Sequence, residues 1–423
     1  MKLHGPAGPM QGSADLPGDK SISHRALLHA ALSPGESRLQ NMLRAGVTTA
    51  MIACLRQLGV SIQGEGSELK VRGGTWQQPK APLNCGNSGT TMRLLMGALA
   101  GMPLQVKLTG TAGLQRRPMN RVARPLREMG ADVSADDAGL SIKGGNLHGC
   151  EHYLEVASAQ VKAALLLAAL QAEGPTTIHQ PAPSRDHSER MLRELRINVL
   201  SSSNVVRLHP NHRPLPPTNL TVPGDFSSAA FLIAAAVLLP GSQVKLRRVG
   251  INPTRTGLLD ALNAMGANIS IENRSESGGE PVADITARHS RLRAVEVRGE
   301  QVVRMIDELP VFAVLATQAE GVTTVCDAAE LRVKESDRIS AFAGEVRRMG
   351  IVITELPDGF RLSGPQQITA AAVDSHSDHR LAMSLIVAAL LADGESTVQR
   401  ADAVQESFPG FTRALRVLGT EVH

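Results

Sequence analysis

One short segment recurs six times along the 423-residue chain. The copies are Leu55–Val60, Leu126–Ala131, Leu192–Ile197, Leu262–Ala267, Val346–Ile351 and Leu415–Thr420. Successive copies are 71, 66, 70, 84 and 69 residues apart, so six units of about 70 residues account for the whole chain. In five copies a glycine occupies the place where a left-handed helix C-cap is usual, and Arg196 replaces it in the third. The sequence therefore predicts a fold built from six copies of one unit.

A second pattern has the same period: a polar head, an apolar helix, a glycine and an alternating strand. The heads are Lys20–Ser21, Asn87–Thr90, Ser158–Gln160, Asp225–Ser228, Asp307–Glu308 and Asp378–Arg380. The helix that follows is apolar nearly all round, as in Val161–Leu170, which is typical of a buried helix. Each unit thus predicts alternating strands and helices, with one buried and one amphipathic helix. Three such units can form a domain with the buried helices at its centre and the sheets outside.

The phrase Pro-Gly-Asp occurs at 17–19 and again at 223–225, close to the midpoint and just after the proline-rich loop 209–217. We interpret the two copies as crossovers between domains, near 17–20 and 222–226. The first domain is then expected at 20–224, with three units. The second is expected to combine 1–19 with 225–423 and to hold the other three.

Composition excludes several classes of protein. Aromatic residues make up only 2% of the chain, with one Trp and one Tyr, which argues against stacking platforms for single-stranded nucleic acid. The four cysteines form no C-x-x-C pair, so neither a disulfide framework nor a metal site is expected. The N-terminus lacks the apolar core of a signal peptide, and the longest apolar run, 229–239, is too short to span a bilayer. We therefore expect a cytoplasmic protein that binds neither nucleic acid nor membrane.

Cationic side chains gather in the helix heads and in the loops at equivalent points of the repeats. They are Lys20, Arg25, Arg93, Arg117, Arg185, Lys334, Arg338 and Arg380. Guanidinium groups bind phosphate or carboxylate with two parallel hydrogen bonds, so this set predicts a small ligand with more than one anionic group. Asp307 and Glu335 stand among the cations as candidate acid–base groups. Capped helices with solvated ion pairs remain an alternative for any single segment. Neither the phosphate-loop motif of nucleotide kinases nor the glycine fingerprint of dehydrogenases occurs.

Five of these segments together resemble a known family. They are 17–25 (PGDKSISHR), 86–93 (GNSGTTMR), 117–119 (RPM), 332–338 (RVKESDR) and 378–380 (DHR). In this order they resemble the EPSP synthase family of enolpyruvyl transferases, over the full length of the chain. The resemblance implies an α/β fold of the inside-out α/β barrel type, with two domains of three β-α-β-α-β-β units each. It also implies transfer of the enolpyruvyl group of phosphoenolpyruvate to the 5-hydroxyl of shikimate 3-phosphate, a step of the shikimate pathway to chorismate and aromatic amino acids, which glyphosate targets.

Site residues follow from the same resemblance, motif by motif. For shikimate 3-phosphate it implies Lys20, Ser21, Arg25, Ser158, Ala159, Gln160, Ser184, Arg185, Asp307 and Lys334. For phosphoenolpyruvate it implies Lys20, Asn87, Gly89, Arg117, Gln160, Arg338 and Arg380. The catalytic set would be Asp307 as base toward the 5-hydroxyl, Glu335 for proton transfer at the enolpyruvyl methyl, and Lys20. No metal or organic cofactor is implied, and we expect a monomer.

Two alternatives remain. UDP-N-acetylglucosamine 1-carboxyvinyltransferase is similar in its repeats but has a reactive Cys in a loop matching Gly113–Met119, which holds no Cys here. A non-catalytic polyanion-binding protein would need neither Asp307 nor Glu335. The chain also departs from well-known family members at Leu94, Ala159, Glu330 and Glu406.

Overall fold

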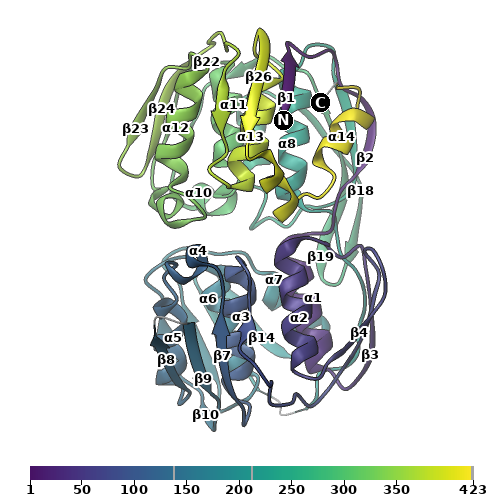
Figure 1. The fold of residues 1–423 in the computed structure, drawn as a ribbon, viewed down its shortest axis with the longest axis vertical. Coiled ribbons are helices and arrows are strands. Elements are labelled where there is room, and N and C mark those ends of the chain that lie inside the picture. Colours follow the sequence, from purple (N-terminus) through teal and green to yellow (C-terminus); the bar gives the residue numbers. More distant parts are fainter. Residues whose placement is uncertain (137–138, 211–212, 421–423) are drawn as a thin grey trace. The chain divides into compact units, whose positions relative to one another are not determined.

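The computed structural model describes residues 1–136, 139–210 and 213–420, so part of the proline-rich loop, 211–212, lies outside it. The chain divides into two compact units. The first, here called the N-terminal unit, comprises Gly18–Val222 with Glu276–Glu280. The second, the C-terminal unit, comprises Met1–Pro17, Pro223–Ser275 and Pro281–His423. Figure 1 shows the helices and strands of each unit.

The N-terminal unit contains three four-stranded sheets. Its helices are α1 (Lys20–Leu32), α2 (Gly46–Gln57), α3 (Gly89–Leu99), α4 (Ala112–Gln115), α5 (Asn120–Glu128), α6 (Ala159–Ala169) and α7 (His187–Glu194). The first sheet has the strand order β16 (Asn219–Thr221), β3 (Gly35–Gln40), β5 (Leu69–Gly73) and β4 (Ser61–Gln63). The second has the order β6 (Leu83–Asn84), β7 (Gln105–Thr109), β9 (Gly139–Lys143) and β8 (Asp132–Asp136). The third has the order β11 (Glu151–Tyr153), β13 (Thr176–His179), β15 (Val205–His209) and β14 (Asn198–Ser202). A short pair, β10 (Leu147–His148) with β12 (Ala172–Glu173), completes the set.

The three sheets share one pairing scheme. In each, the first strand pairs parallel to the second, and the remaining two pairs are antiparallel. The second strand of each sheet follows a buried helix along the chain, with the short strand β12 between them in the third repeat, and an amphipathic helix and two further strands come next. The sequence repeats therefore correspond to repeats of structure within this unit.

The C-terminal unit also contains three sheets, but they have four, five and three strands. Its helices are α8 (Phe226–Leu238), α9 (Gly257–Ala264), α10 (Glu300–Met305), α11 (Leu309–Thr317), α12 (Arg338–Arg348), α13 (His379–Ala389) and α14 (Phe411–Val417), with the 3-10 helices η1 (Ala329–Val333) and η2 (Ala401–Glu406). The strands of its first sheet, in spatial order, are β18 (Asn268–Ser277), β19 (Glu280–Arg288), β17 (Gln243–Gly250) and β2 (Gln11–Asp15). In the second sheet β20 (Leu292–Arg293) and β21 (Glu296–Val297) both pair with β22 (Ala319–Val325), which is followed by β24 (Gly359–Gly364) and β23 (Ile353–Leu356). The third sheet has the order β1 (Lys2–Gly5), β26 (Gly394–Gln399) and β25 (Ala372–Asp374). The N-terminal strands β1 and β2 thus complete two sheets formed by the last 200 residues or so of the chain.

The repeated C-cap has the backbone conformation that the sequence predicts. The five glycines at this point of the repeats have φ between 80° and 108°. Arg196, which replaces glycine in the third copy, has φ 62°. Because this left-handed conformation is strained for most side chains, it explains why glycine occupies the position in the other five copies.

The helices that follow the polar heads are buried. In the N-terminal unit α3 and α6 pack so closely that a Cβ at Gly97 would lie 2.1 Å from the carbonyl oxygen of Ala164. The core of each unit is built mainly from Ala, Leu, Val, Ile and Met, and the core of the C-terminal unit also contains all seven phenylalanines of the chain. The mixed α/β architecture predicted from the sequence is thereby confirmed. Among the residues described, no helix is both long and apolar enough to cross a membrane.

Candidate active site

The first turn of α1 carries the cationic stretch around which the N-terminal unit's candidate site is built. Asp19 caps this helix, its carboxylate accepting from the backbone N–H of Ile22 at 2.9 Å. The helix therefore begins at Lys20, and Ser21 and Arg25 follow on its first turns. A helix N-terminus with positive side chains favours an anion.

Arg25 is a buried guanidinium with fixed partners. Its Nε donates to Ser188 Oγ at 2.7 Å, while Nη1 and Nη2 donate to the backbone carbonyls of Ser21 and Ala159 at 2.9 and 3.3 Å. Burial lowers the pKa of Arg25 to about 10, with the charge of Glu189 acting in the opposite direction. Arg25 therefore stays protonated at neutral pH and joins the head of α1 to the head of α6.

The heads of α3 and α6 also meet. Ser88 and Ser158 cap the two helices through their hydroxyl oxygens. Gln160 on α6 accepts a short hydrogen bond from Arg93 on α3 and donates to Thr90 Oγ1 at 2.9 Å. The sequence indicated Arg93 only as one cation among many. Its partner could not be found from spacing, because the two residues belong to different repeats.

Gly89 begins α3 beside two guanidinium groups. A Cβ at this position would lie 3.1 Å from Arg117 Nη1 and 3.3 Å from Arg93 Nη1. Glycine here therefore leaves room for Arg117, which follows the short helix α4. Asn87 lies in the loop before α3, where its Oδ1 accepts from Thr111 Oγ1 at 3.2 Å.

Ser184 and Arg185 lie in the loop that precedes α7. Ser184 is buried, and its hydroxyl donates a short hydrogen bond to Gln180. Its carbonyl oxygen accepts from Lys162 Nζ at 3.2 Å. The charge of Arg185 is close enough to act on Arg25. The N-terminal unit thus brings the polar side chains of α1, α3, α6 and this loop together.

Arg338 is the centre of the candidate site in the C-terminal unit. This guanidinium, 1% exposed, contacts three carboxylates: Asp378 at 2.8 Å through Nε, Asp307 at 3.2 Å through Nη1 and Glu335 at 2.7 Å through Nη2. Asp378 is fully buried, whereas Asp307 and Glu335 remain 17% and 20% exposed. The two candidate acid–base groups therefore share one cation and keep access to the surface.

Charges in this cluster set its titration. Burial opposes the charged form of Arg338, but the carboxylates of Asp378, Glu335 and Asp307 raise its pKa above the ordinary value. Burial lowers the pKa of Lys334, and the charge of Asp307 partly offsets that effect. Lys334 is thus near Asp307, as expected for residues that share a ligand.

Arg380, the second residue of α13, is as deeply buried as Arg338. It is 1% exposed, and its guanidinium lies 5.9 Å from the ring centre of Phe231. Within the described part of the chain, its buried Nε and Nη1 have no hydrogen-bond partner. Buried guanidinium donors without partners are costly, so this side chain is suited to binding an anion.

The charged segment 330–338 covers most of a 3-10 helix, a loop and the first residue of α12. Helix α12 begins at Arg338, and Lys334 and Glu335 lie between η1 and α12. The three remain neighbours because the loop folds back, as the Glu335–Arg338 contact shows. Sequence reasoning noted Asp378 only beside Arg380. Its place as the buried partner of Arg338 depends on a contact across 40 residues.

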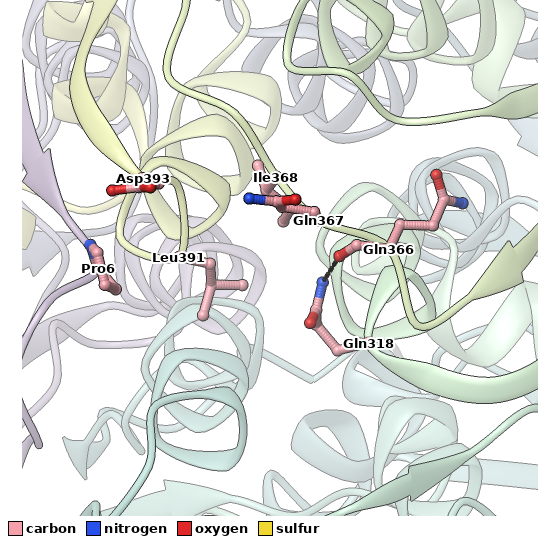
Figure 2. A pocket seen from close by; sticks show the side chains of 7 residues that line it. All are labelled: Pro6, Gln318, Gln366, Gln367, Ile368, Leu391 and Asp393. Atoms are coloured by element: carbon pink, nitrogen blue, oxygen red, sulfur yellow. Dashed lines mark hydrogen bonds between the residues drawn. The ribbon is translucent and has the colours of Figure 1, made fainter.

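Within the described ranges, no group of three or more His, Cys, Asp or Glu side chains is arranged to hold a metal ion. A pocket of about 400 Å³ lies in the C-terminal unit, and Figure 2 shows the side chains that line it. It is lined by Pro6, Gln318, Gln366, Gln367, Ile368, Leu391 and Asp393, with no cation to bind a phosphate.

Comparison with known proteins agrees with the motifs. The sequence profile of the family "EPSP synthase (3-phosphoshikimate 1-carboxyvinyltransferase)" matches residues 5–415. A 3-phosphoshikimate 1-carboxyvinyltransferase of Syntrophomonas wolfei is 46% identical over 99% of both chains, and one of an Anaeromyxobacter species is 49% identical over 96% of this chain and 95% of its own. The solved structure of EPSP synthase from Acinetobacter baumannii is similar, with a TM-score of 0.88, 40% identity and coverage of 99% of this chain and 97% of that one. The chain belongs to the EPSP synthase family.

Proposed function

We propose that the protein transfers the enolpyruvyl group of phosphoenolpyruvate to the 5-hydroxyl of shikimate 3-phosphate and releases phosphate. The observation that carries this proposal is the Arg338 cluster, in which two partly exposed carboxylates share one buried guanidinium next to Lys334. Family membership over nearly the whole chain supplies the substrates. Both substrates are polyanions, and their negative charges complement the cationic side chains of the two units.

The proposed binding residues divide by unit. Shikimate 3-phosphate would contact the polar heads of α1 and α6 and the Ser184 loop of the N-terminal unit, with Asp307 and Lys334 from the C-terminal unit. Phosphoenolpyruvate would contact Arg338 and Arg380, together with a set from the N-terminal unit. That set is Lys20, Asn87, Gly89, Arg117 and Gln160. The buried donors of Arg380 support this assignment because phosphate or carboxylate oxygens would satisfy them.

The proposed chemistry uses the two carboxylates in turn. Asp307 takes the proton of the 5-hydroxyl as its oxygen attacks C2 of phosphoenolpyruvate. Glu335 delivers a proton to C3, which becomes a methyl group. In the second half, a methyl proton returns to Glu335, the C2–O bond to phosphate breaks, and the proton held by Asp307 passes to the leaving phosphate, so that both carboxyl groups regain their starting state. Positive charge develops at C2 in both halves, where neighbouring carboxylates stabilise it while the cations hold the phosphate.

The finer description of the fold belongs to the same proposal. We propose that each unit is an inside-out α/β barrel of three repeats and that the units correspond to the two predicted domains. The recurrent pairing scheme supports this interpretation. The monomeric state and the cytoplasmic location stay predictions.

Phosphate release with two different acceptors tests the proposal. Purified protein is given phosphoenolpyruvate with shikimate 3-phosphate, and in a parallel reaction with UDP-N-acetylglucosamine. We expect release only with shikimate 3-phosphate. Release only with the sugar nucleotide would assign the rival transferase activity, and release with neither would refute the assignment as an enzyme.

A further inference from the structure

The first turn of α7 places three consecutive buried polar side chains against three different partners. His187, Ser188 and Glu189 are 1%, 4% and 1% exposed. His187 Nδ1 lies 2.8 Å from Glu280 Oε1, at the tip of the β18–β19 hairpin. Ser188 accepts from Arg25, and Glu189 Oε1 lies 2.6 Å from Lys162 Nζ. This turn is therefore tied to α1, to α6 and to the hairpin.

Ser188 accepts the hydrogen bond that Arg25 donates through Nε. The two terminal nitrogens of Arg25 bind carbonyl oxygens of α1 and α6, and the bond from Nε to Ser188 reaches α7. Because a guanidinium is planar, a bond at Nε limits its rotation about the side-chain axis. Loss of the Ser188 hydroxyl would leave a buried N–H without its partner and let the guanidinium turn.

Glu189 acts through Lys162 on the Ser184 loop. Lys162 Nζ lies between the Glu189 carboxylate, at 2.6 Å, and the carbonyl oxygen of Ser184, at 3.2 Å. Both charged side chains are 1% exposed. Buried ion pairs of this kind cost desolvation and are often replaced by apolar residues without loss of stability. Stability alone therefore does not account for this pair, whereas its third contact gives it a positioning role.

We propose that Ser188, Lys162 and Glu189 are positioning residues for the shikimate 3-phosphate site: Ser188 orients Arg25, and the Glu189–Lys162 pair holds the Ser184 loop. The inference rests on the proposed function, because it assigns Arg25 and Ser184 to that substrate. None of the three positioning residues needs to touch the substrate.

Two variants test the proposal, so that the test does not depend on whether any one variant folds. Ser188→Ala removes the acceptor of Arg25. The double variant Lys162→Met/Glu189→Leu replaces both buried charges by side chains of similar size, so it should fold with an unchanged or higher Tm. Ser37→Ala is the control. Ser37 lies on β3 and is also buried in the N-terminal unit, but its hydroxyl accepts a hydrogen bond from the backbone N–H of Thr218 at 3.1 Å instead of from a proposed site residue.

The readout is the KM for each substrate, together with titration calorimetry of shikimate 3-phosphate alone. We expect both test variants to bind shikimate 3-phosphate about tenfold more weakly, by loss of one hydrogen bond to a charged group. The KM for phosphoenolpyruvate should change less than about twofold, and Ser37→Ala should leave both constants unchanged. Unchanged shikimate 3-phosphate binding in both variants would overturn the inference. An inactive wild-type protein would instead refute the proposed function.

Discussion

Asp307 and Glu335 share a single guanidinium, and this contact sets what their substitution should do. Asp307→Asn and Glu335→Gln keep the shape and one acceptor oxygen toward Arg338 but remove the ability to accept a proton. We expect each to lower kcat by about two to four orders of magnitude, with little change in Tm. Steady-state kinetics and thermal unfolding measure the two effects.

The control for these acids is Asp260→Asn, which removes a carboxylate from an ion pair with Arg304 on the surface of α9. It should retain full turnover. If both Asp307→Asn and Glu335→Gln kept kcat within about threefold of wild type, the acid–base assignment would be wrong.

Arg380 is a better test of phosphoenolpyruvate binding than Arg338. Replacing Arg338 would leave the buried Asp378 uncompensated, which typically costs about 3–5 kcal/mol, so a loss of binding could reflect misfolding. Arg380→Gln removes a charge whose Nε and Nη1 have no partner among the described residues. We expect the KM for phosphoenolpyruvate to rise about tenfold to a hundredfold. Arg361→Gln, at an exposed position on β24, is the charge-matched control, and an equal KM in the two variants would contradict the assignment.

For individual residues, the sequence predicts the chemical type of the site residues better than it predicts their hydrogen-bond partners. The cations and carboxylates at the helix heads could be named because each follows a recurrent turn. The bonds from Arg93 to Gln160 and from Arg25 to Ser188 span 67 and 163 residues. Only packing of different repeats brings such pairs together, and no local pattern encodes it.

Helix α1 should make the free energy of unfolding depend on pH, because two of its histidines are buried in the folded protein. Burial lowers the pKa of His24 to about 4 and that of His29 to about 3, well below the value of about 6.5 in an unfolded chain. Below pH 6.5 or so the unfolded chain therefore binds protons that the folded unit does not. The free energy of unfolding should fall by about 1.4 kcal/mol per pH unit for each histidine as the pH drops toward 4, and should be insensitive to both above about pH 7.5.

His29→Leu isolates one of these contributions. Denaturant unfolding of wild type and variant is compared between pH 8 and pH 5. The difference in unfolding free energy between the two proteins should shift in favour of the variant by about 1.4 kcal/mol per pH unit below pH 6. Parallel curves would show that His29 is not buried neutral in the folded protein.

Elements were predictable where local chemistry sets them. The left-handed C-cap follows from glycine in five copies, and Arg196 adopts the same conformation in the third copy because the fold requires the same turn there. The segment before α12 could not be placed, since Asp337 rather than an earlier residue caps that helix through its carboxylate. Spacing of three and four residues between charges is compatible with a helix and with a turn that folds back.

For the whole molecule, six repeats with buried helices predicted the mixed α/β fold, and the resemblance of five motifs predicted the family; both are confirmed. The sequence did not predict to which unit the tip of the β18–β19 hairpin belongs. The segment 276–280 reads as an ordinary turn with two glycines, yet it belongs to the N-terminal unit, where Glu280 meets His187. Such a contact depends on the length and twist of β18 and β19, which local sequence does not specify.

The most direct test of the central claim is to follow the reaction by ³¹P NMR. Protein, phosphoenolpyruvate and shikimate 3-phosphate are mixed in equal substrate amounts. The account predicts that both substrate signals decline together while inorganic phosphate and one new phosphate ester rise in equal amounts. Substrate signals that persist unchanged, or phosphate released without a new ester, would contradict it.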